Sequence, residues 1–292
     1  MFATALLILQ AAFQSPQLTE SSGVAVSRAY PGVVWSHNDS GDGPYLYATD
    51  RLGSNRGRLT VAGARAIDWE DMALGPCPVR FLQRPRVPPS TCLYLADTGD
   101  NLGVRPFVTV YVIPEPEPPQ SAGDTLGMTQ AAAVLQLRYP DGSHDVEGIY
   151  VSPRDTALYL VSKGARRGSA IRVYRVDRRS WSTRDTTRSI AVASLVQTLD
   201  IDPSPEAGRV ITGAAVRPDG RVVALRTYTE VYLFYPGVQG RLSPARERPC
   251  DISGVDSGGE AVAFDGDTTL VLTSEASGRR RPGRISTVRC GL

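Results

Sequence analysis

The residues best suited to chemistry in this sequence are carboxylates that recur in one short pattern. Glu70, Glu147 and Glu260 each stand directly before a short apolar run that is typical of a β-strand. Converging carboxylates repel one another and lose hydration, and such a cluster is tolerated if a hard cation lies among them. Calcium is such a cation and takes about six to eight oxygen ligands. If the fold brings the three side chains together, the sequence predicts a divalent-cation site that binds calcium.

Other polar groups would add oxygens to this site. Asn38, Asp39, Asp97, Asp100 and Asn101 lie in two polar strings, N-D-S-G and D-T-G-D-N, that follow apolar segments. Oxygen donors of this kind are further candidate ligands for calcium. The alternative interpretation is that the glutamates accept hydrogen bonds from backbone N–H groups of neighbouring repeats and hold the ring without a metal.

The chain has two histidines, His37 and His144, and both lie in these polar segments. A histidine near a metal-bound water is suited to act as a general base, so both are candidate catalytic residues. The alternative is that they are surface residues of polar loops. A nucleophilic Ser40 is not favoured, because the sequence has no G-x-S-x-G elbow around it.

Two cations, Lys163 and Arg226, end apolar segments at equivalent places in their repeats. Cations beside a metal site suit a phosphate or carboxylate, so these two are predicted to bind a small anionic ligand. More arginines occur in loops expected on the same face: Arg166, Arg167, Arg279, Arg280 and Arg281. For Arg279, Arg280 and Arg281, solvation of an exposed loop is a sufficient explanation.

The elements that must position these residues are short strands in a repeated unit. Apolar residues alternate with a period of two and helical periodicity is nearly absent, which predicts an all-β protein. Further strands follow each repeat, so we expect a single β-propeller with four antiparallel strands per blade. Five repeats are counted, and the two longest intervals leave room for a sixth blade. The first strands of the repeats are residues 22–26, 70–74, 147–151, 212–216 and 260–264.

Propeller topology predicts that the chemical residues meet. The first strand of a blade runs from one face to the other and the second strand runs back, so first-strand starts and second-strand ends share a face. The three glutamates begin first strands, whereas Asp39, Asp97, Lys163 and Arg226 follow or end second strands. All are therefore expected on one face, around the central channel. The last repeat lacks an outer strand, and residues 15–19 are expected to complete it.

The N-terminus and the cysteines indicate export. Residues 2–9 are apolar but too short to span a bilayer, which takes roughly 20 apolar residues. Residues 1–14 are predicted to be a signal peptide, followed by a propeller domain at 15–292. The four cysteines fit an oxidising compartment, so the expected location is secreted, periplasmic or at the cell surface.

The cysteines are predicted to form two disulfides. The favoured pairs are Cys77 with Cys92 and Cys250 with Cys290, and the alternative is four buried free thiols. The first bridge would close a short loop and stabilise the fold by about 3 kcal/mol in the chain-entropy model. A zinc ribbon is not expected, because no C-x-x-C pair is present.

Composition excludes some partners. The sequence has 32 Lys and Arg against 30 Asp and Glu, a net charge of +2 over 292 residues. A nucleic-acid partner is not expected, because such proteins carry a concentrated basic surface. The sequence also lacks a nicotinamide, flavin or nucleotide fingerprint, and a monomer is the expected state.

An ordered set of motifs gives a resemblance. The set resembles a family of exported bacterial β-propeller proteins and is distantly similar to phytase-like and calcium-dependent lactonase-type propellers. The resemblance covers most of the chain from about Glu20 onward. The strings are N-D-S-G at 38–41, D-W-E-D at 68–71, D-T-G-D-N at 97–101, Y-P-D-G at 139–142, D-V-E-G at 145–148 and L-R-T-Y at 225–228.

The resemblance implies calcium bound by channel carboxylates. By position these would be the three repeated glutamates together with Asp71, Asp97 and Asp145. The sequence departs from the pattern at Ser22 and Thr212, where hydroxyls replace the acids. It also has no match to the phosphate-binding motifs of propeller phytases, which weakens the case for phytase activity.

The sequence therefore supports two hypotheses of function. The first is an exported, calcium-binding propeller that acts as a metal-dependent hydrolase on a small anionic substrate, a phosphate ester or a lactone or other ester. The second is a non-catalytic ligand- or protein-binding propeller, in which a structural cation or a ring of capping glutamates fixes the channel. An enzyme would leave a coordination position open to water, whereas a structural site would be closed by protein oxygens.

Overall fold

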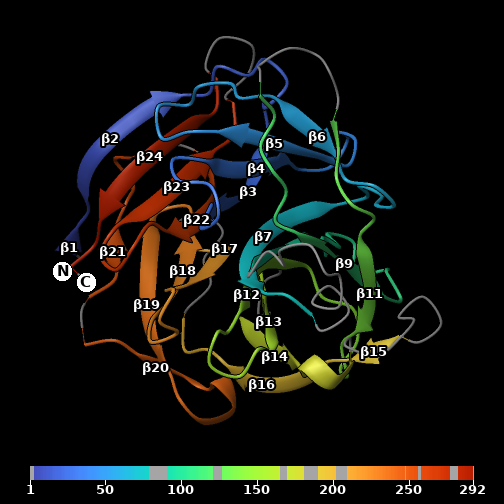
Figure 1. The fold of residues 1–292 in the computed structure, drawn as a ribbon. Helices are drawn as coiled ribbons and strands as arrows, with labels where there is room; N and C mark the ends of the chain where they lie inside the picture. The colour runs from blue at the N-terminus through green and yellow to red at the C-terminus, as the bar shows by residue number, and fades with distance from the viewer. Residues whose placement is uncertain are drawn as a thin grey trace.

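The computed structural model describes residues 3–78, 91–120, 127–164, 170–180, 190–201, 209–246, 248–255, 258–276 and 282–291. Over these residues the strands form five sheets in a ring around a central channel (Figure 1). The five-bladed arrangement confirms the predicted all-β propeller, and the described residues form no sixth blade. No helix in the described ranges is long and apolar enough to cross a membrane.

Each blade has at least four strands, counted outward from the channel. Blade 1 has β3 (Ser21–Val26), β4 (Val34–Asn38), β5 (Tyr45–Thr49) and β6 (Arg58–Thr60). Blade 2 has β7 (Trp69–Pro76), β8 (Thr91–Asp97), β9 (Val108–Pro114) and β11 (Ala133–Arg138). Blade 3 has β12 (Val146–Val151), β13 (Leu158–Ser162), β14 (Arg172–Val176) and β16 (Ser194–Thr198). Blade 4 has β17 (Ile211–Val216), β18 (Val223–Thr227), β19 (Glu230–Pro236), β20 (Leu242–Pro244) and β21 (Cys250–Asp251). Blade 5 has β22 (Gly259–Phe264), β23 (Leu270–Ser274), β24 (Arg284–Arg289) and β2 (Leu6–Ala12).

Short elements join neighbouring blades. Three two-residue strands pair in parallel with the outer strands of blades 1, 2 and 4, and two single 3-10 turns lie in connections. These elements are β10 (Gly127–Met128), β15 (Ala191–Val192), β1 (Ala3–Thr4), η1 (Arg178–Ser180) and η4 (Val238–Gly240).

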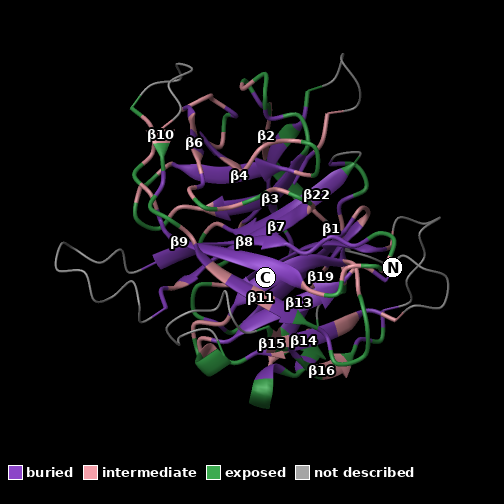
Figure 2. Ribbon diagram, turned by 90° about the vertical axis from the view of Figure 1, so that its right-hand side faces the viewer, coloured by how far each residue is buried: buried purple, intermediate pink, exposed green. Residues whose placement is uncertain are grey.

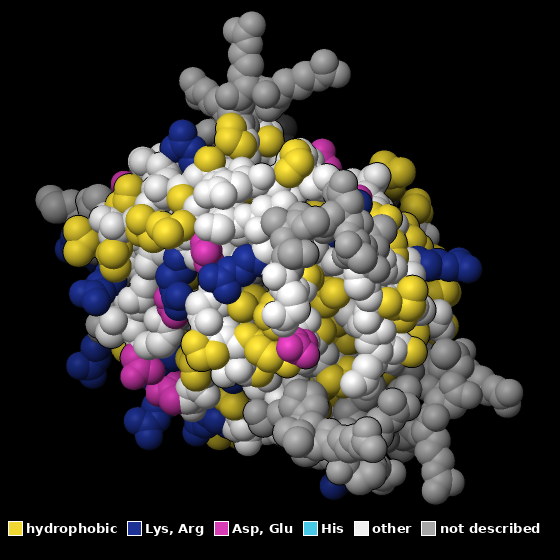
Figure 3. Space-filling view, turned by 45° about the horizontal axis from the view of Figure 1, so that its top comes forward, with side chains coloured by type: hydrophobic (Ala, Val, Ile, Leu, Met, Phe, Trp, Pro, Cys, Tyr) yellow, Lys and Arg dark blue, Asp and Glu magenta, His cyan; other side chains and the backbone are white. Residues whose placement is uncertain are grey.

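The five predicted first strands are the inner strands β3, β7, β12, β17 and β22. They are buried along almost their whole length, and exposed residues concentrate in the connections (Figure 2). The core lies between blades: one cluster of buried residues, for example, includes Leu135 of blade 2 and Ile149 of blade 3. On the face shown in Figure 3, acidic and apolar side chains lie among the Lys and Arg side chains.

The ring closes through the N-terminal strand. β2 pairs antiparallel with β24 from Leu6, opposite Arg289, to Ala12, opposite Arg284. The expectation that residues 15–19 complete the last blade is wrong, because the apolar run before them supplies the edge strand. The two chain ends consequently lie close together (Figure 1). Residues 6–12 thus belong to the last blade, and a signal peptide at residues 1–14 stays a prediction.

Both predicted disulfides are present. Cys77 bonds to Cys92 across a separation of 15 residues, joining β8 to the segment that follows β7. Cys250 bonds to Cys290 across 40 residues and ties the outer part of blade 4 to the end of β24 in blade 5. The second bridge therefore reinforces the ring beside its closure.

Every inner strand has a β-bulge near its first residues. The pairing register shifts at the same place in all five, so that a residue is left out of the ladder. A bulge bends the strand and re-aims its side chains. The residues at the bulges are those that the repeat pattern aligned, namely Ser22, Glu70, Glu147, Thr212 and Glu260.

Asp71, directly after the bulge in β7, joins three blades. Its Oδ1 accepts the N–H of Met72 at 2.8 Å, and its Oδ2 accepts the N–H of Ile149 at 2.8 Å and of Ala214 at 3.1 Å. Burial raises the pKa of Asp71, and the three N–H donors oppose that rise. This carboxylate realises the capping arrangement that the sequence suggested for the glutamates.

We expect Asp71→Ala to destabilise the protein strongly. A buried N–H left without an acceptor costs about 1–3 kcal/mol, and three would lose theirs, so the free energy of unfolding should fall by about 3 kcal/mol or more. Denaturant unfolding would measure the loss. The control is Asp219→Ala, which removes an exposed ion pair with Arg217 and should cost less than about 1 kcal/mol. Equal effects of the two changes would contradict the anchoring role.

Candidate metal centre on the channel face

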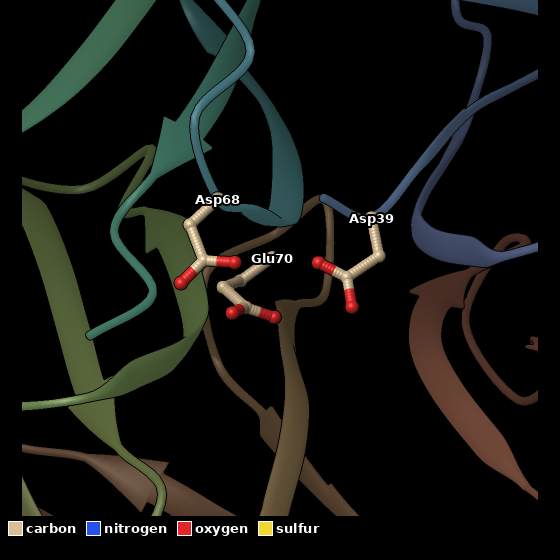
Figure 4. Close-up of side chains that lie close together, drawn as sticks. All are labelled: Asp39, Asp68 and Glu70. Atoms are coloured by element: carbon tan, nitrogen blue, oxygen red, sulfur yellow. The ribbon is translucent and has the colours of Figure 1, made fainter. Parts of the chain in front are cut away.

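Carboxylates from three blades meet at the face where the inner strands begin, which we call the site face. One group is Asp39, Asp68 and Glu70, whose ligand oxygens all lie within 4.8 Å of one another. Figure 4 shows their carboxyl groups turned toward one another, from the segment after β4 and from the start of β7. A second group, Glu70, Asp145 and Glu147, meets the same distance and shares Glu70.

Local structure delivers these side chains to one point. Asp68 directly precedes β7 and Glu70 lies at its bulge, while Asp39 directly follows β4. Gly99, in the D-T-G-D-N string, provides the space. A Cβ on Gly99 would lie 2.1 Å from Glu70 Oε1 and 2.4 Å from Asp68 Oδ2, so a side chain there would collide with both carboxylates.

An internal cation occupies one side of the cluster. Lys163 directly follows β13, and its Nζ lies 2.5 Å from Glu147 Oε1 and 3.9 Å from Asp145 Oδ2. Burial lowers the pKa of Lys163, but attraction to Glu147, Asp145 and Glu70 outweighs it and raises the pKa. The ammonium therefore stays charged and offsets part of the negative charge of the second group. Among the described residues no cation pairs directly with a carboxylate of the first group, although Arg105, which pairs with Asp97, lowers the pKa of Asp68.

The cluster is electrostatically strained without a further cation. Burial, and then repulsion from Glu147, Asp39 and Asp68, raises the pKa of Glu70. Burial also raises the pKa of Glu147, against the lowering effect of Lys163. Asp68 has its pKa raised to about 6, by burial and by repulsion from Asp39 and Asp145. All three acids resist ionisation together, which is the arrangement that a bound divalent cation would relieve.

Three predicted ligands lie outside the two groups. Glu260 is buried nearby, and burial and repulsion from Glu147 and Glu275 raise its pKa, but its oxygens do not join either group. Asp97 is fully buried and instead accepts the N–H of Asp68 at 3.2 Å and Arg105 Nη2 at 2.9 Å. Asp97 and Asp71 therefore position the backbone around the cluster, whereas Asp39, Asp145, Glu70 and Glu147 form it.

The two histidines differ in access. His37 is fully buried, edge-on to Trp69, and packed so closely on Gly23 that a Cβ there would lie 2.2 Å from its Nε2. Burial lowers the pKa of His37, so its imidazole is neutral. His144 is half-buried and lines a pocket of about 90 Å³ together with Asp145, with its Nε2 3.1 Å from Asp141 Oδ1. Of the two, His144 shares a pocket with a carboxylate of the cluster, Asp145.

The two predicted anion-binding residues bond to other groups of the protein. Lys163 is paired with Glu147, and Arg226 is fully buried with its Nη1 donating to the carbonyls of Ala261 at 2.7 Å and Thr273 at 2.9 Å. Arg226 therefore bonds blade 4 to blade 5. The loop arginines predicted for this face, Arg166, Arg167, Arg279, Arg280 and Arg281, lie outside the described residues.

The sequence pattern missed two contributors to the site. Asp68 was visible in the D-W-E-D string but precedes the repeated position, so alignment of the repeats did not select it. Arg105 follows the D-T-G-D-N string and pairs with Asp97, a contact that depends on how the loop folds back. That fold is set by Asp100, whose carboxylate accepts the N–H groups of Val104 and Arg105 at 2.8 and 3.0 Å.

The fold and the site define a β-propeller with an acidic channel mouth, and similarity to known proteins extends to the fold alone. No protein-family model matches the sequence, and no curated protein matches it. Among solved structures, the PQQ-bound aldose sugar dehydrogenase of Streptomyces coelicolor is 13% identical with a TM-score of 0.54, over 98% of this chain and 98% of that one. The soluble aldose sugar dehydrogenase of Escherichia coli, in its apo-form, is 10% identical with a TM-score of 0.51, over 96% and 99%. A glucose dehydrogenase is 10% identical with a TM-score of 0.50, over 99% and 100%.

These likenesses support the β-propeller class. Their sequence identity is too low to transfer an activity, because one fold serves many functions. The resemblance to phytase-like and lactonase-type propellers stays a prediction.

The raised pKa of Asp68 predicts the sign of a pH effect. A carboxyl whose pKa rises on folding binds its proton more tightly in the folded state, so its contribution to stability falls as pH rises from about 4 through about 6. In EDTA, this contribution should therefore lower the melting temperature between about pH 4 and about pH 7. Asp68→Asn should flatten that drop, and an unchanged profile in the variant would contradict the assignment.

Proposed function

We propose that this protein is an exported β-propeller that binds calcium at Asp39, Asp68 and Glu70 and uses the site to hydrolyse a small anionic substrate. The observation that carries the proposal is the convergence of these three carboxylates within 4.8 Å on the site face. The two disulfides support export, because such bonds persist in oxidising compartments.

The donor set favours a hard cation. Each of the three residues offers carboxylate oxygen, and no histidine or cysteine joins the group, which suits calcium better than zinc. Lys163 already offsets charge at Glu147 and Asp145, whereas no described cation pairs directly with Asp39, Asp68 or Glu70. Gly99 keeps the space between Asp68 and Glu70 open.

The surrounding residues would serve hydrolysis as follows. Calcium bound at these oxygens would supply a Lewis acid that polarises a phosphoryl or carbonyl oxygen. His144 lines a pocket together with Asp145 and would accept a proton from water in this proposal. Lys163 holds Glu147 in place, and Arg226 is held within the core.

The substrate is proposed to be a phosphate ester or a lactone or other ester. The cations on this face that are described pair with protein groups, so an anionic substrate would be drawn by the bound cation. We expect the protein to act as a monomer.

The alternative function is a non-catalytic ligand- or protein-binding propeller with a structural cation. One observation favours it: capping by buried polar groups does hold this channel, through Asp71 and through the Ser22 hydroxyl that donates to the Glu70 carbonyl at 2.6 Å. In that case calcium would still bind but no hydrolysis would follow.

Calcium binding can be tested by melting temperature. Wild-type protein stripped with EDTA should melt higher when calcium is added, because a ligand that binds the folded state stabilises it. Glu70→Gln should lose this rise, and in EDTA it should melt above wild type, because it removes a buried charge that its neighbours oppose. Glu275→Gln, on the same face but outside both groups, should keep the calcium response. A calcium response retained in Glu70→Gln would refute the site.

Hydrolysis can be tested with calcium-loaded protein, p-nitrophenyl phosphate and a simple γ-lactone. We expect turnover of one of them to stop in EDTA, and His144→Asn to lower kcat by about 100-fold, the order expected for loss of a general base. Calcium binding without turnover of either substrate would favour the non-catalytic alternative.

A further inference from the structure

A second pocket lies on the face opposite the acidic cluster, between blades 3 and 4. It has a volume of about 230 Å³ and is bordered by Tyr150 at the end of β12, the 152–155 turn, Val216 at the end of β17, and the 236–240 segment. Tyr150 and Val216 also line the apolar end of the central channel, so the pocket opens beside it.

An unpartnered hydroxyl marks this pocket. Tyr150 is 1% exposed, and its ring stacks on Tyr159 with centroids 4.8 Å apart and an angle of 7°. The Tyr159 hydroxyl donates to Asp155 at 2.8 Å, but the buried Tyr150 hydroxyl has no hydrogen-bond partner among the described residues. Buried polar groups are nearly always bonded, so this one calls for a bound partner. Burial raises the pKa of Tyr150, which keeps the hydroxyl protonated and able to donate.

The charges around the pocket leave a cation available. Asp155 pairs with Arg175 at 3.3 Å, an arginine that also pairs with Asp177 at 2.5 Å, and it accepts the N–H of Ala157 at 3.2 Å. Arg154 donates Nη1 to the carbonyl of Pro236 at 3.3 Å, and no described carboxylate forms an ion pair with it. The pocket therefore presents two donors, a guanidinium and a phenol, beside the paired carboxylate of Asp155 and next to apolar groups.

The two loops at the rim are held in demanding conformations. Thr156 and Gln239 are the non-glycine residues in the described chain with positive φ, at 57° and 54°, and both lie in these loops. Gly240 also has positive φ, and a Cβ there would lie 2.1 Å from the Tyr159 ring. Such conformations persist where the surroundings impose them, and they cluster at ligand sites.

We propose that this pocket binds a small organic carboxylate. Its carboxylate group would accept hydrogen bonds from Tyr150 and Arg154, and its apolar part would pack against Val216 and Pro236. The pocket lies at the other end of the channel from Asp39, Asp68 and Glu70, so this binding is independent of the cation site.

The test measures the binding of acetate, butyrate and benzoate to the full-length protein in EDTA by titration calorimetry. We expect benzoate to bind with one site per chain and benzamide, its neutral analogue, to bind at least about tenfold more weakly. Tyr150→Phe and Arg154→Gln should each weaken benzoate at least about tenfold. Arg217→Gln is the control: it removes a cation on the same face that is paired with Asp219, and should change the affinity less than about twofold.

Tyr150→Phe also separates binding from folding. It removes a hydroxyl with no described partner, so the variant should melt at or above the wild-type temperature without ligand. The proposal is overturned if none of the three carboxylates binds the wild type. It is equally overturned if benzamide matches benzoate, or if a normally folded Tyr150→Phe retains wild-type affinity.

Discussion

The structure depends on how backbone N–H groups are bonded where the five inner strands converge on the central channel. Each strand bulges near its start, and a bulge leaves N–H groups without ladder partners. The carboxylate of Asp71 accepts such groups from three blades at once, so one buried side chain satisfies donors that no strand pairing reaches. Because Glu70 is its neighbour in the chain, the anchor of the ring and the candidate ligand are set by the same bulge.

The acidic cluster is tolerated because its charge is divided. Lys163 offsets part of the charge of Glu147 and Asp145, whereas no described cation pairs directly with Asp39, Asp68 or Glu70. A fold gains nothing from carboxyl groups whose pKa values are raised by burial and mutual repulsion, so their presence at one end of the channel indicates a function. The fold around the cluster is thus well bonded, whereas the carboxyl groups within it still repel one another.

The opposite face shows how a site can escape a motif search. The string from Ser152 to Asp155 has the composition of an ordinary turn, and nothing in its spacing indicates a ligand. The pocket exists because that turn meets the 236–240 segment of the next blade. The group that defines the pocket is the Tyr150 hydroxyl. In the sequence, Tyr150 is simply one of several aromatic residues in predicted strands.

The sequence by itself determined the strands, their order and the equivalence of Glu70, Glu147 and Glu260, because period-two alternation and internal repetition are local signals. It also determined that the polar strings share a face, since strand direction alternates within a blade. Only the tertiary structure decided which of these residues meet. Asp71 turns inward to cap two other blades, Arg226 is buried against blade 5, and residues 6–12 join β24 from the far end of the chain. These outcomes depend on bulges and on partners far apart in sequence, and side-chain direction there is set by packing between blades.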